Sequence, residues 1–296
     1  MTALRDQAMK KLIVNADDFG LSGGANRAVI RACREGILTS TSLMVRGKAF
    51  DEAVSLAREN PGLQVGLHLT LLQGQAVLPP EELPGLVDRE GNFPVDPVLT
   101  GMRYFFCRSL RGELQREIEA QILRFRETGL PLSHIDGHLN IHMHPTVFAI
   151  LAELMPKYGI KSFRLTRENL ARDPATDGTR RFGRRLDAFI FARLAENCRP
   201  VLEKLGIFHT DEVKGLLNSG KMTEAYLLKV LDCLKSGSTE IYFHPGCLPD
   251  PDLASWMPDY LHEEELAALV SPKVRQKITE LGIQLGTYRG EERIDV

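Results

Sequence analysis

Short apolar runs alternate with longer amphipathic stretches along most of the chain. Such alternation is typical of an α/β protein whose parallel strands are joined by right-handed helical crossovers. The apolar runs predict strands at 12–15, 37–45, 64–71, 133–137, 161–166, 207–211, 240–244 and 284–288. The amphipathic stretches predict helices at 25–35, 51–60, 111–128, 145–158, 186–205, 223–235 and 263–281, the last in two pieces. About eight such units predict an irregular (β/α) barrel, with an open doubly wound sheet as the alternative.

Two stretches do not follow this alternation. Residues 73–100 are rich in Pro and Gly, and residues 168–185 are polar and Arg-rich. Because long loops inside a compact domain are usually functional, both stretches are candidate lids. The rest of the pattern is continuous, and we expect a single domain over residues 1–296.

Composition narrows the class of protein. The chain is 43% apolar and 26% charged, with a formal net charge of -2. This balance gives no electrostatic reason to expect nucleic acid or an anionic membrane as a main partner. No run approaches the ~18 consecutive apolar residues of a spanning helix, and the N-terminal stretch has no apolar segment typical of a signal peptide. Five scattered Cys without a C-x-x-C pair indicate reduced thiols and predict a cytoplasmic protein.

The first predicted strand leads into two adjacent carboxylates, Asp17 and Asp18. Ligands of α/β enzymes bind at the carboxyl ends of the strands, and two acids there can divide the work of holding a cation and moving a proton. A turn or helix cap explains the pair equally well when this stretch is considered alone.

Histidines follow the ends of three further strands. His68 lies in the third predicted strand, four His lie between 134 and 144, and His244 ends the seventh predicted strand. In a barrel these strand ends meet at one mouth. His134, Asp136 and His138 alternate, so on a strand they would face the same side. Imidazoles with a carboxylate form a facial site for a divalent ion that leaves positions open for water and substrate, as hydrolysis of an amide or ester requires.

Four motifs together resemble the YdjC-like carbohydrate deacetylases, which include the chitooligosaccharide deacetylases. The motifs are Asn15-Ala-Asp-Asp-Phe-Gly20, Gly66-Leu-His-Leu-Thr70, His134-Ile-Asp-Gly-His138 with His142 beyond it, and Leu285-Gly-Thr-Tyr-Arg289. The resemblance spans nearly the whole chain. Within the family the chain is most similar to the branch associated with hopanoid biosynthesis, thought to deacetylate an N-acetylglucosaminyl hopanoid.

The resemblance implies an irregular barrel of the glycoside hydrolase/deacetylase type with one divalent metal. By motif position, Asp18, His68 and His138 are the implied metal ligands, and Asp17 is the implied general base. Family members often carry three consecutive His after His-x-Asp-x, whereas Leu139 and Asn140 replace the second and third here. Any role of those additional imidazoles is therefore not carried over.

The remaining candidates each have a competing structural explanation. His244 is the candidate general acid, or a His that caps a turn at a strand end. Asp136 is expected to orient an imidazole or to bind the metal directly, and Arg164 to hold Asp17 or a sugar oxygen or to form a surface ion pair. Trp256 is expected to stack on a sugar or to pack in the core. His134 and His142 complete the set as residues that support the site or touch the substrate.

The sequence thus predicts a metal-dependent hydrolase that removes an acetyl group from an N-acetylated sugar, which is a chitooligosaccharide or a glycolipid. Mixed N and O ligands suit several divalent ions, with Mg or Zn favoured. A glycolipid substrate would bring a peripheral membrane contact, and the family suggests a homodimer. The alternatives are a phosphodiesterase or glycosidase on the same barrel, or a carbohydrate- or glycolipid-binding protein without catalysis.

Overall fold

The computed structural model describes residues 9–172, 174 and 181–290. Its strands are β1 (Lys10–Phe19), β2 (Ser40–Leu43), β3 (Gln64–Leu69), β4 (Leu132–Gly137), β5 (Glu212–Lys214), β6 (Gly237–Phe243) and β7 (Ile283–Leu285). Its α-helices are α1 (Gly23–Glu35), α2 (Phe50–Glu59), α3 (Pro97–Phe106), α4 (Arg111–Glu127), α5 (Pro145–Tyr158), α6 (Arg181–Lys204), α7 (Glu224–Cys233), α8 (Pro251–Trp256), α9 (His262–Leu269) and α10 (Pro272–Glu280). Short 3-10 turns are η1 (Pro80–Glu82), η2 (Arg108–Leu110), η3 (His138–Met143) and η4 (Leu170–Arg172).

The strands form one parallel sheet in the order β4-β3-β2-β1-β6-β5, with β7 also paired to β1. The central strand β1 has β6 along one edge and shares its other edge between β7 and β2. The carbonyl oxygens of Leu12 and Val14 point to that shared edge, where they accept from the amides of Gly286 and Thr39. A central strand with a neighbour on each edge carries its side chains into a buried core, and Leu12, Val14 and Ala16 are fully buried.

The curved sheet is completed by two isolated parallel bridges, Ile135 to Phe163 and Ser162 to Phe208. They link β4 to the segment 161–164, and that segment to the chain leading into β5. The prediction of an irregular (β/α) barrel is therefore confirmed, and the open doubly wound sheet is not the architecture. The predicted strands 161–166 and 207–211 are reduced to these bridges, since each makes only one or two ladder contacts.

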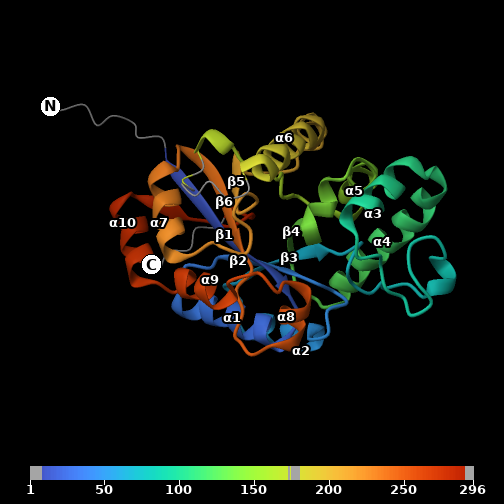
Figure 1. Cartoon of the computed structure of the whole chain (residues 1–296), viewed down its shortest axis with the longest axis horizontal. Coiled ribbons are helices and arrows are strands. Elements are labelled where there is room, and N and C mark those ends of the chain that lie inside the picture. Colours follow the sequence, from blue (N-terminus) through green and yellow to red (C-terminus); the bar gives the residue numbers. More distant parts are fainter. Residues whose placement is uncertain (1–8, 173, 175–180, 291–296) are drawn as a thin grey trace.

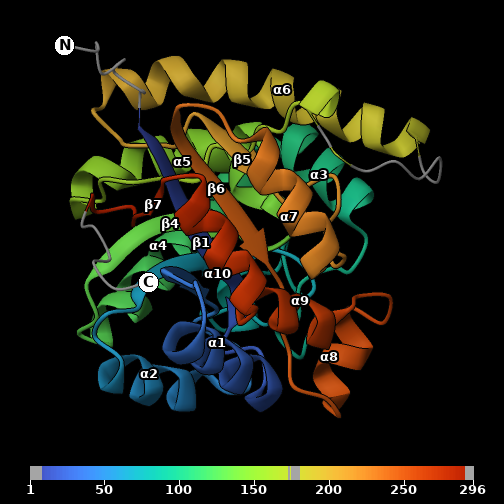
Figure 2. The same ribbon diagram turned by 90° about the vertical axis from the view of Figure 1, so that its left-hand side faces the viewer.

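Helices surround the barrel on all sides. Figure 1 shows α7, α9 and α10 on one side and α3, α4 and α5 on the other, with α6 along the top and α1, α2 and α8 below. Figure 2 shows the full length of α6 running across the molecule. Within the described residues, no helix is both long and apolar enough to cross a membrane, and all five cysteines are free thiols.

The stretch 73–100 is more ordered than its sequence suggests. It contains η1, an antiparallel bridge between Gln75 and Asn92, and the start of α3. The buried carboxylate of Glu117 on α4 accepts from the amides of Val77 and Leu78 and fastens this segment to the barrel. Of the other candidate lid, residues 173 and 175–180 lie outside the described residues.

Candidate active site

Asp17 and Asp18 lie inside β1 rather than after it, and a bulge turns both toward the same end of the barrel. Pairing of β1 with β2 shifts between Ala16 and Phe19, so three steps on β1 face two on β2. Asp18 has a φ of 61°, a left-handed conformation that non-glycine residues adopt at a cost of about 1–3 kcal/mol. Adjacent residues of a regular strand would face opposite sides, so the bulge is what gives the two carboxylates one site.

Asp18, His68 and His138 meet at the mouth of the barrel. The Asp18 Oδ1 atom is 3.2 Å from Nε2 of His68 and 3.1 Å from Nδ1 of His138. All three residues are buried. They come from β1, β3 and the first position of η3, so the carboxyl ends of three parallel strands build this cluster. These are the three residues that the sequence motifs single out as metal ligands.

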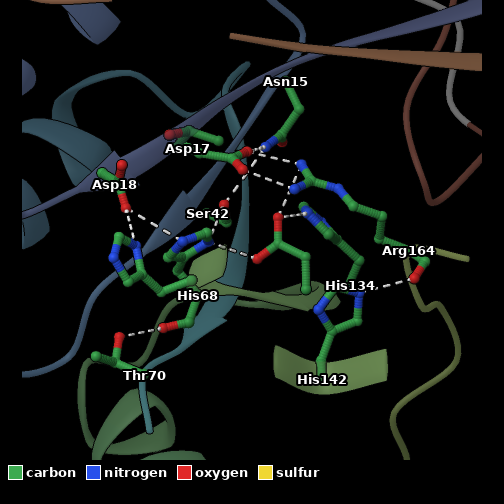
Figure 3. A network of polar contacts seen from close by, with 12 residues as sticks. Asn15, Asp17, Asp18, Ser42, His68, Thr70, His134, His142 and Arg164 are labelled. Carbon is green, nitrogen blue, oxygen red and sulfur yellow. Dashed lines mark hydrogen bonds and ion pairs between the residues drawn. The ribbon is translucent and has the colours of Figure 1, made fainter. Parts of the chain in front are cut away.

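The hydrogen bonds of the two imidazoles fix which nitrogen faces Asp18. His68 Nδ1 is 2.8 Å from a carboxylate oxygen of Asp136, which can only accept, so this nitrogen carries the proton. His138 Nε2 is 3.0 Å from the amide oxygen of Gln73 and donates to it. The remaining nitrogen of each ring therefore faces Asp18, and once it has given up a proton it can present a lone pair to the same point. Figure 3 shows the His68 ring beside Asp18.

The cluster fits a divalent cation. The Asp18 Oδ2 atom is buried without a hydrogen-bond partner among the described residues. One ligand atom from each of Asp18, His68 and His138 lies within 4.8 Å of the others. A second group with this spacing, Asp17 with His68 and Asp136, is a poorer site, because the Arg164 guanidinium already neutralises both of its carboxylates.

The contacts within the cluster favour the charged forms of Asp18 and His68. Burial alone would raise the pKa of Asp18, but the imidazoles of His138 and His68 hold it well below its usual value. Burial alone would lower the pKa of His68, but Asp136 and Asp18 raise it to about 10. Asp136 and Asp18 thus stabilise a positive charge on His68. A metal cation that displaced this proton would supply the positive charge in its place.

Arg164 anchors Asp17 at the back of the site. Its Nη1 and Nη2 donate to the two oxygens of Asp17, each at 2.7 Å. It also reaches Asp136 at 2.9 Å and Glu240 at 2.7 Å, and lies 4.5 Å from the ring centre of Tyr242. Arg164 is fully buried, so the interpretation as a surface ion pair is wrong, and burial together with three carboxylates explains the fixed position of Asp17.

His244 follows β6 and faces Asp17 across the mouth. Its Nε2 is 4.0 Å from Asp17 Oδ2. Its Nδ1 is buried without a partner among the described residues, and burial lowers its pKa. Its main chain is held on both sides, because its amide donates to Glu265 and its carbonyl accepts from His262. The imidazole is therefore well placed but not committed to another residue.

A cavity of about 250 Å³ brings these groups together. Asp17, His68, His138 and His244 line it. Trp256, at the end of α8, also lines it, with its ring 5.4 Å from that of His138 at an interplanar angle of 64°. Tyr260 adds a second aromatic wall against His244. Trp256, the aromatic residue expected near the site, thus lines a cavity large enough for a sugar.

His134 and His142 lie behind the cavity rather than along it. The His134 ring stacks on Tyr288 at 4.1 Å, and its Nε2 is 3.7 Å from Asp136. Gly66 leaves room for this ring, since a Cβ there would come within 2.4 Å of it. His142 donates to the carbonyl of Arg164 at 2.9 Å, and burial lowers its pKa to about 3. Their contacts support Asp136 and Arg164.

Sequence reasoning missed two residues of the site. Gln73 sets the proton on His138, and it lies in a stretch whose sequence gives no such signal. Glu240 shares Arg164 with Asp17 and hydrogen-bonds Tyr288. A charged residue directly before the buried apolar run Ile241-Tyr-Phe243 was a signal that could have revealed it.

Several known proteins are similar to this chain over most of its length. The chain is 32% identical to a carbohydrate deacetylase of Brevibacillus brevis, with 94% of this chain and 98% of that protein covered. It is also 32% identical to a chitooligosaccharide deacetylase of Escherichia fergusonii, with 94% and 97% covered. A crystal structure of a suggested cellobiose-phosphate cleavage protein from Enterococcus faecalis is similar, with 28% identity, a TM-score of 0.74, and 95% and 98% of the two chains covered. The family model of the YdjC-like proteins matches residues 11–280, and this chain belongs to that family.

Proposed function

We propose that the protein is a metal-dependent carbohydrate deacetylase that hydrolyses the N-acetyl group of an amino sugar. One observation carries the proposal: a buried Asp18, His68 and His138 cluster opens into the same cavity as Asp17 and His244. The activity of the named relatives supports it, because those relatives match this chain over nearly their whole length.

Asp18, His68 and His138 would hold one divalent cation. When bound there, such a cation polarises a carbonyl group and lowers the pKa of a water molecule. The nitrogen-rich set suits Zn, while a carboxylate with water would also serve Mg, so both remain within the proposal.

The protein's own residues supply the proton transfers. Asp17 accepts a proton from the attacking water, and hydrogen bonds from Arg164 and Asn15 orient its carboxylate. A C–O bond forms at the acetyl carbon, and its C–N bond breaks. His244 gives a proton to the departing nitrogen, which leaves as the free amine of the sugar, and acetate is the other product. If Asp17 is the base and His244 the acid, both side chains must face the same reacting group. The distance of 4.0 Å between His244 Nε2 and Asp17 Oδ2 allows this.

The substrate beyond the acetylated sugar is a finer proposal. We favour a glycolipid, of which an N-acetylglucosaminyl hopanoid is one example, over a chitooligosaccharide. A second cavity of about 840 Å³ shares Gln73 and Trp256 with the catalytic cavity. Its wall includes Leu21, Met44 and Phe93. An apolar group joined to the sugar would fit this wall better than further hydrated sugars would.

A mass-resolved screen for released acetate tests the function, using N-acetylglucosamine oligomers and glycolipids with and without a chelator. Acetate release that the chelator abolishes is the expected result. New reducing ends would indicate a glycosidase, and free phosphate a phosphodiesterase. Binding of sugars or glycolipids without any product would indicate a binding protein.

A further inference from the structure

The helix α3 presents its apolar side outward. Its inward positions are Thr100 and Tyr104, and the Tyr104 hydroxyl donates to the carbonyl of Leu71. Its outward positions follow helical spacing and continue onto the preceding loop. The large apolar residues of this surface, each 53–71% exposed, are Val95, Val98, Leu99, Met102, Phe105 and Phe106. We call this set the α3 apolar face.

The polarity of α3 is the reverse of what a surface helix in water requires. Helices on globular proteins normally turn polar residues to solvent, and contiguous exposed apolar patches mark interaction sites. Figure 1 places α3 on the outer side of the molecule, away from α7 and α10. Within the described part of the chain, no other element of comparable length has so many large apolar side chains exposed.

The α3 apolar face is continuous with the substrate site. Val95 belongs to the face and also lines the 840 Å³ cavity. That cavity reaches the catalytic cavity at Gln73 and Trp256. A continuous path therefore runs from the exposed helix through the two cavities to the metal cluster. A protein partner on this face would border the substrate entrance, whereas a lipid surface would present a substrate there.

Two cations border the face. Arg103 and Arg108 are exposed, and neither has an ion-pair partner among the residues that the structure describes. Arg103 also lines the larger cavity. An apolar face with arginines at its edge matches a helix that lies in the boundary between anionic head groups and acyl chains.

We propose that the α3 apolar face docks the protein on an anionic lipid bilayer, so that a glycolipid enters the larger cavity directly from the membrane. The docking stands on α3 alone, while the entry of a glycolipid rests on the proposed deacetylase function. Val98, Met102, Phe105 and Phe106 insert among the acyl chains, and Arg103 and Arg108 meet the head groups.

Flotation with mixed phosphatidylcholine–phosphatidylglycerol vesicles tests the docking. The full chain should float with the vesicles. The double variant Met102→Glu/Phe106→Glu should bind them at least about tenfold more weakly, because two apolar side chains no longer enter the bilayer. Arg103→Gln/Arg108→Gln should weaken binding to the anionic vesicles but not to pure phosphatidylcholine.

A matched control replaces exposed apolar residues that lie outside the α3 apolar face. Met9 precedes β1 and Leu123 lies near the end of α4, and they are 48% and 44% exposed. Met9→Glu/Leu123→Glu should bind vesicles as the natural chain does. All three double variants should keep the far-UV circular dichroism and the melting temperature of the natural chain, which shows that they fold.

Several outcomes would overturn the docking. One is a natural chain that does not float, and another is undiminished flotation of Met102→Glu/Phe106→Glu. A third is a dimer, seen by sedimentation velocity, that this variant converts to monomers without any vesicle binding, since a second copy would then cover the face. Flotation does not depend on catalysis: Asp17→Asn should still float, so loss of the proposed activity alone leaves the docking result intact.

Discussion

Arg164 and Asp17 form a bidentate ion pair, with both N–O distances at 2.7 Å, in a position closed to solvent. The same guanidinium contacts Asp136 and Glu240. Arg164 is therefore the counter-charge of three carboxylates, one of which also holds His68. The orientation of the proposed base and that of a proposed metal ligand are linked through this single side chain.

Removing the Arg164 charge should lower the free energy of unfolding by about 3–5 kcal/mol, because buried carboxylates would lose their partner. Urea unfolding of Arg164→Gln measures this. Arg193→Gln is the matched control, since Arg193 pairs with Glu196 on the exposed surface of α6, and it should change stability little. Equal stability of the natural chain and Arg164→Gln would contradict the assigned role.

Mutation should distinguish the role of Asp17 from that of Asp18. Asp17→Asn should keep its metal yet turn over at least about 10²-fold more slowly, because an amide cannot accept the proton. Asp18→Asn should lose metal, as should His68→Ala and His138→Ala. Elemental analysis and acetate release, measured on the same samples, check both statements. Full turnover by Asp17→Asn would exclude it as the base, and undiminished metal in Asp18→Asn would exclude it as a ligand.

Gln73 should affect metal binding through His138. Gln73→Leu removes the acceptor that fixes the proton on His138 Nε2, and we expect metal affinity to fall by about 10–100-fold, the usual effect of losing such an outer partner. Competition with a chromophoric chelator measures this. Gln75→Leu is the control, because Gln75 contacts Arg46 at the surface. Similar affinities for the two variants would show that Gln73 does not set the tautomer.

His244 as general acid is tested by the leaving group. His244→Ala should lose at least about 10²-fold on an N-acetyl sugar, whose amine must be protonated to leave. It should lose far less on an aryl acetate, because a phenolate departs without a proton. The ratio of the two rates, compared with that of the natural chain, is the measurement. Equal losses on both substrates would assign His244 a role in positioning instead.

The sequence predicts the barrel well where the pattern is strong. The strands near Val14, Leu67 and Ile241 and most helices lie close to their predicted positions, since long periodic segments depend on local pattern. The pattern fails at 161–166 and 207–211, where the chain closes the barrel by single bridges. It also fails at α3, which begins inside the Pro- and Gly-rich stretch 73–100, and at α8, which has only six residues and begins at Pro251.

The residues of the site likewise divide into those that the sequence predicts and those that it does not. Motifs identify Asp18, His68 and His138, which the fold brings together from three distant segments. The role of Gln73 could not be predicted, because it depends on a contact across the barrel that no local pattern encodes. For Glu240 only the charge next to an apolar run is visible in the sequence, and its partner Arg164 is not. Asp17 and Asp18 share one site only because of the β-bulge and the left-handed backbone conformation of Asp18. Neither feature can be read from two adjacent Asp residues in the sequence.

Glu265 provides a prediction that depends on pH. Its buried carboxylate accepts from the amides of Met222 and His244, yet burial raises its pKa from 4.5 to about 7. Between these values the folded protein binds a proton at Glu265 that the unfolded chain has released. Rising pH therefore lowers the free energy of unfolding through this window, by about 3 kcal/mol for a shift of this size.

Glu265→Gln should remove this loss of stability with rising pH, because the amide does not ionise. The variant's free energy of unfolding, relative to that of the natural chain, should therefore rise by about 3 kcal/mol between pH 4.5 and pH 8. Urea titrations at several pH values measure the difference, and Glu264→Gln, on the exposed side of α9, should show no such trend. A difference that stays constant with pH would mean that Glu265 ionises alike in both states. His244 would then be held by a charged carboxylate throughout the physiological range.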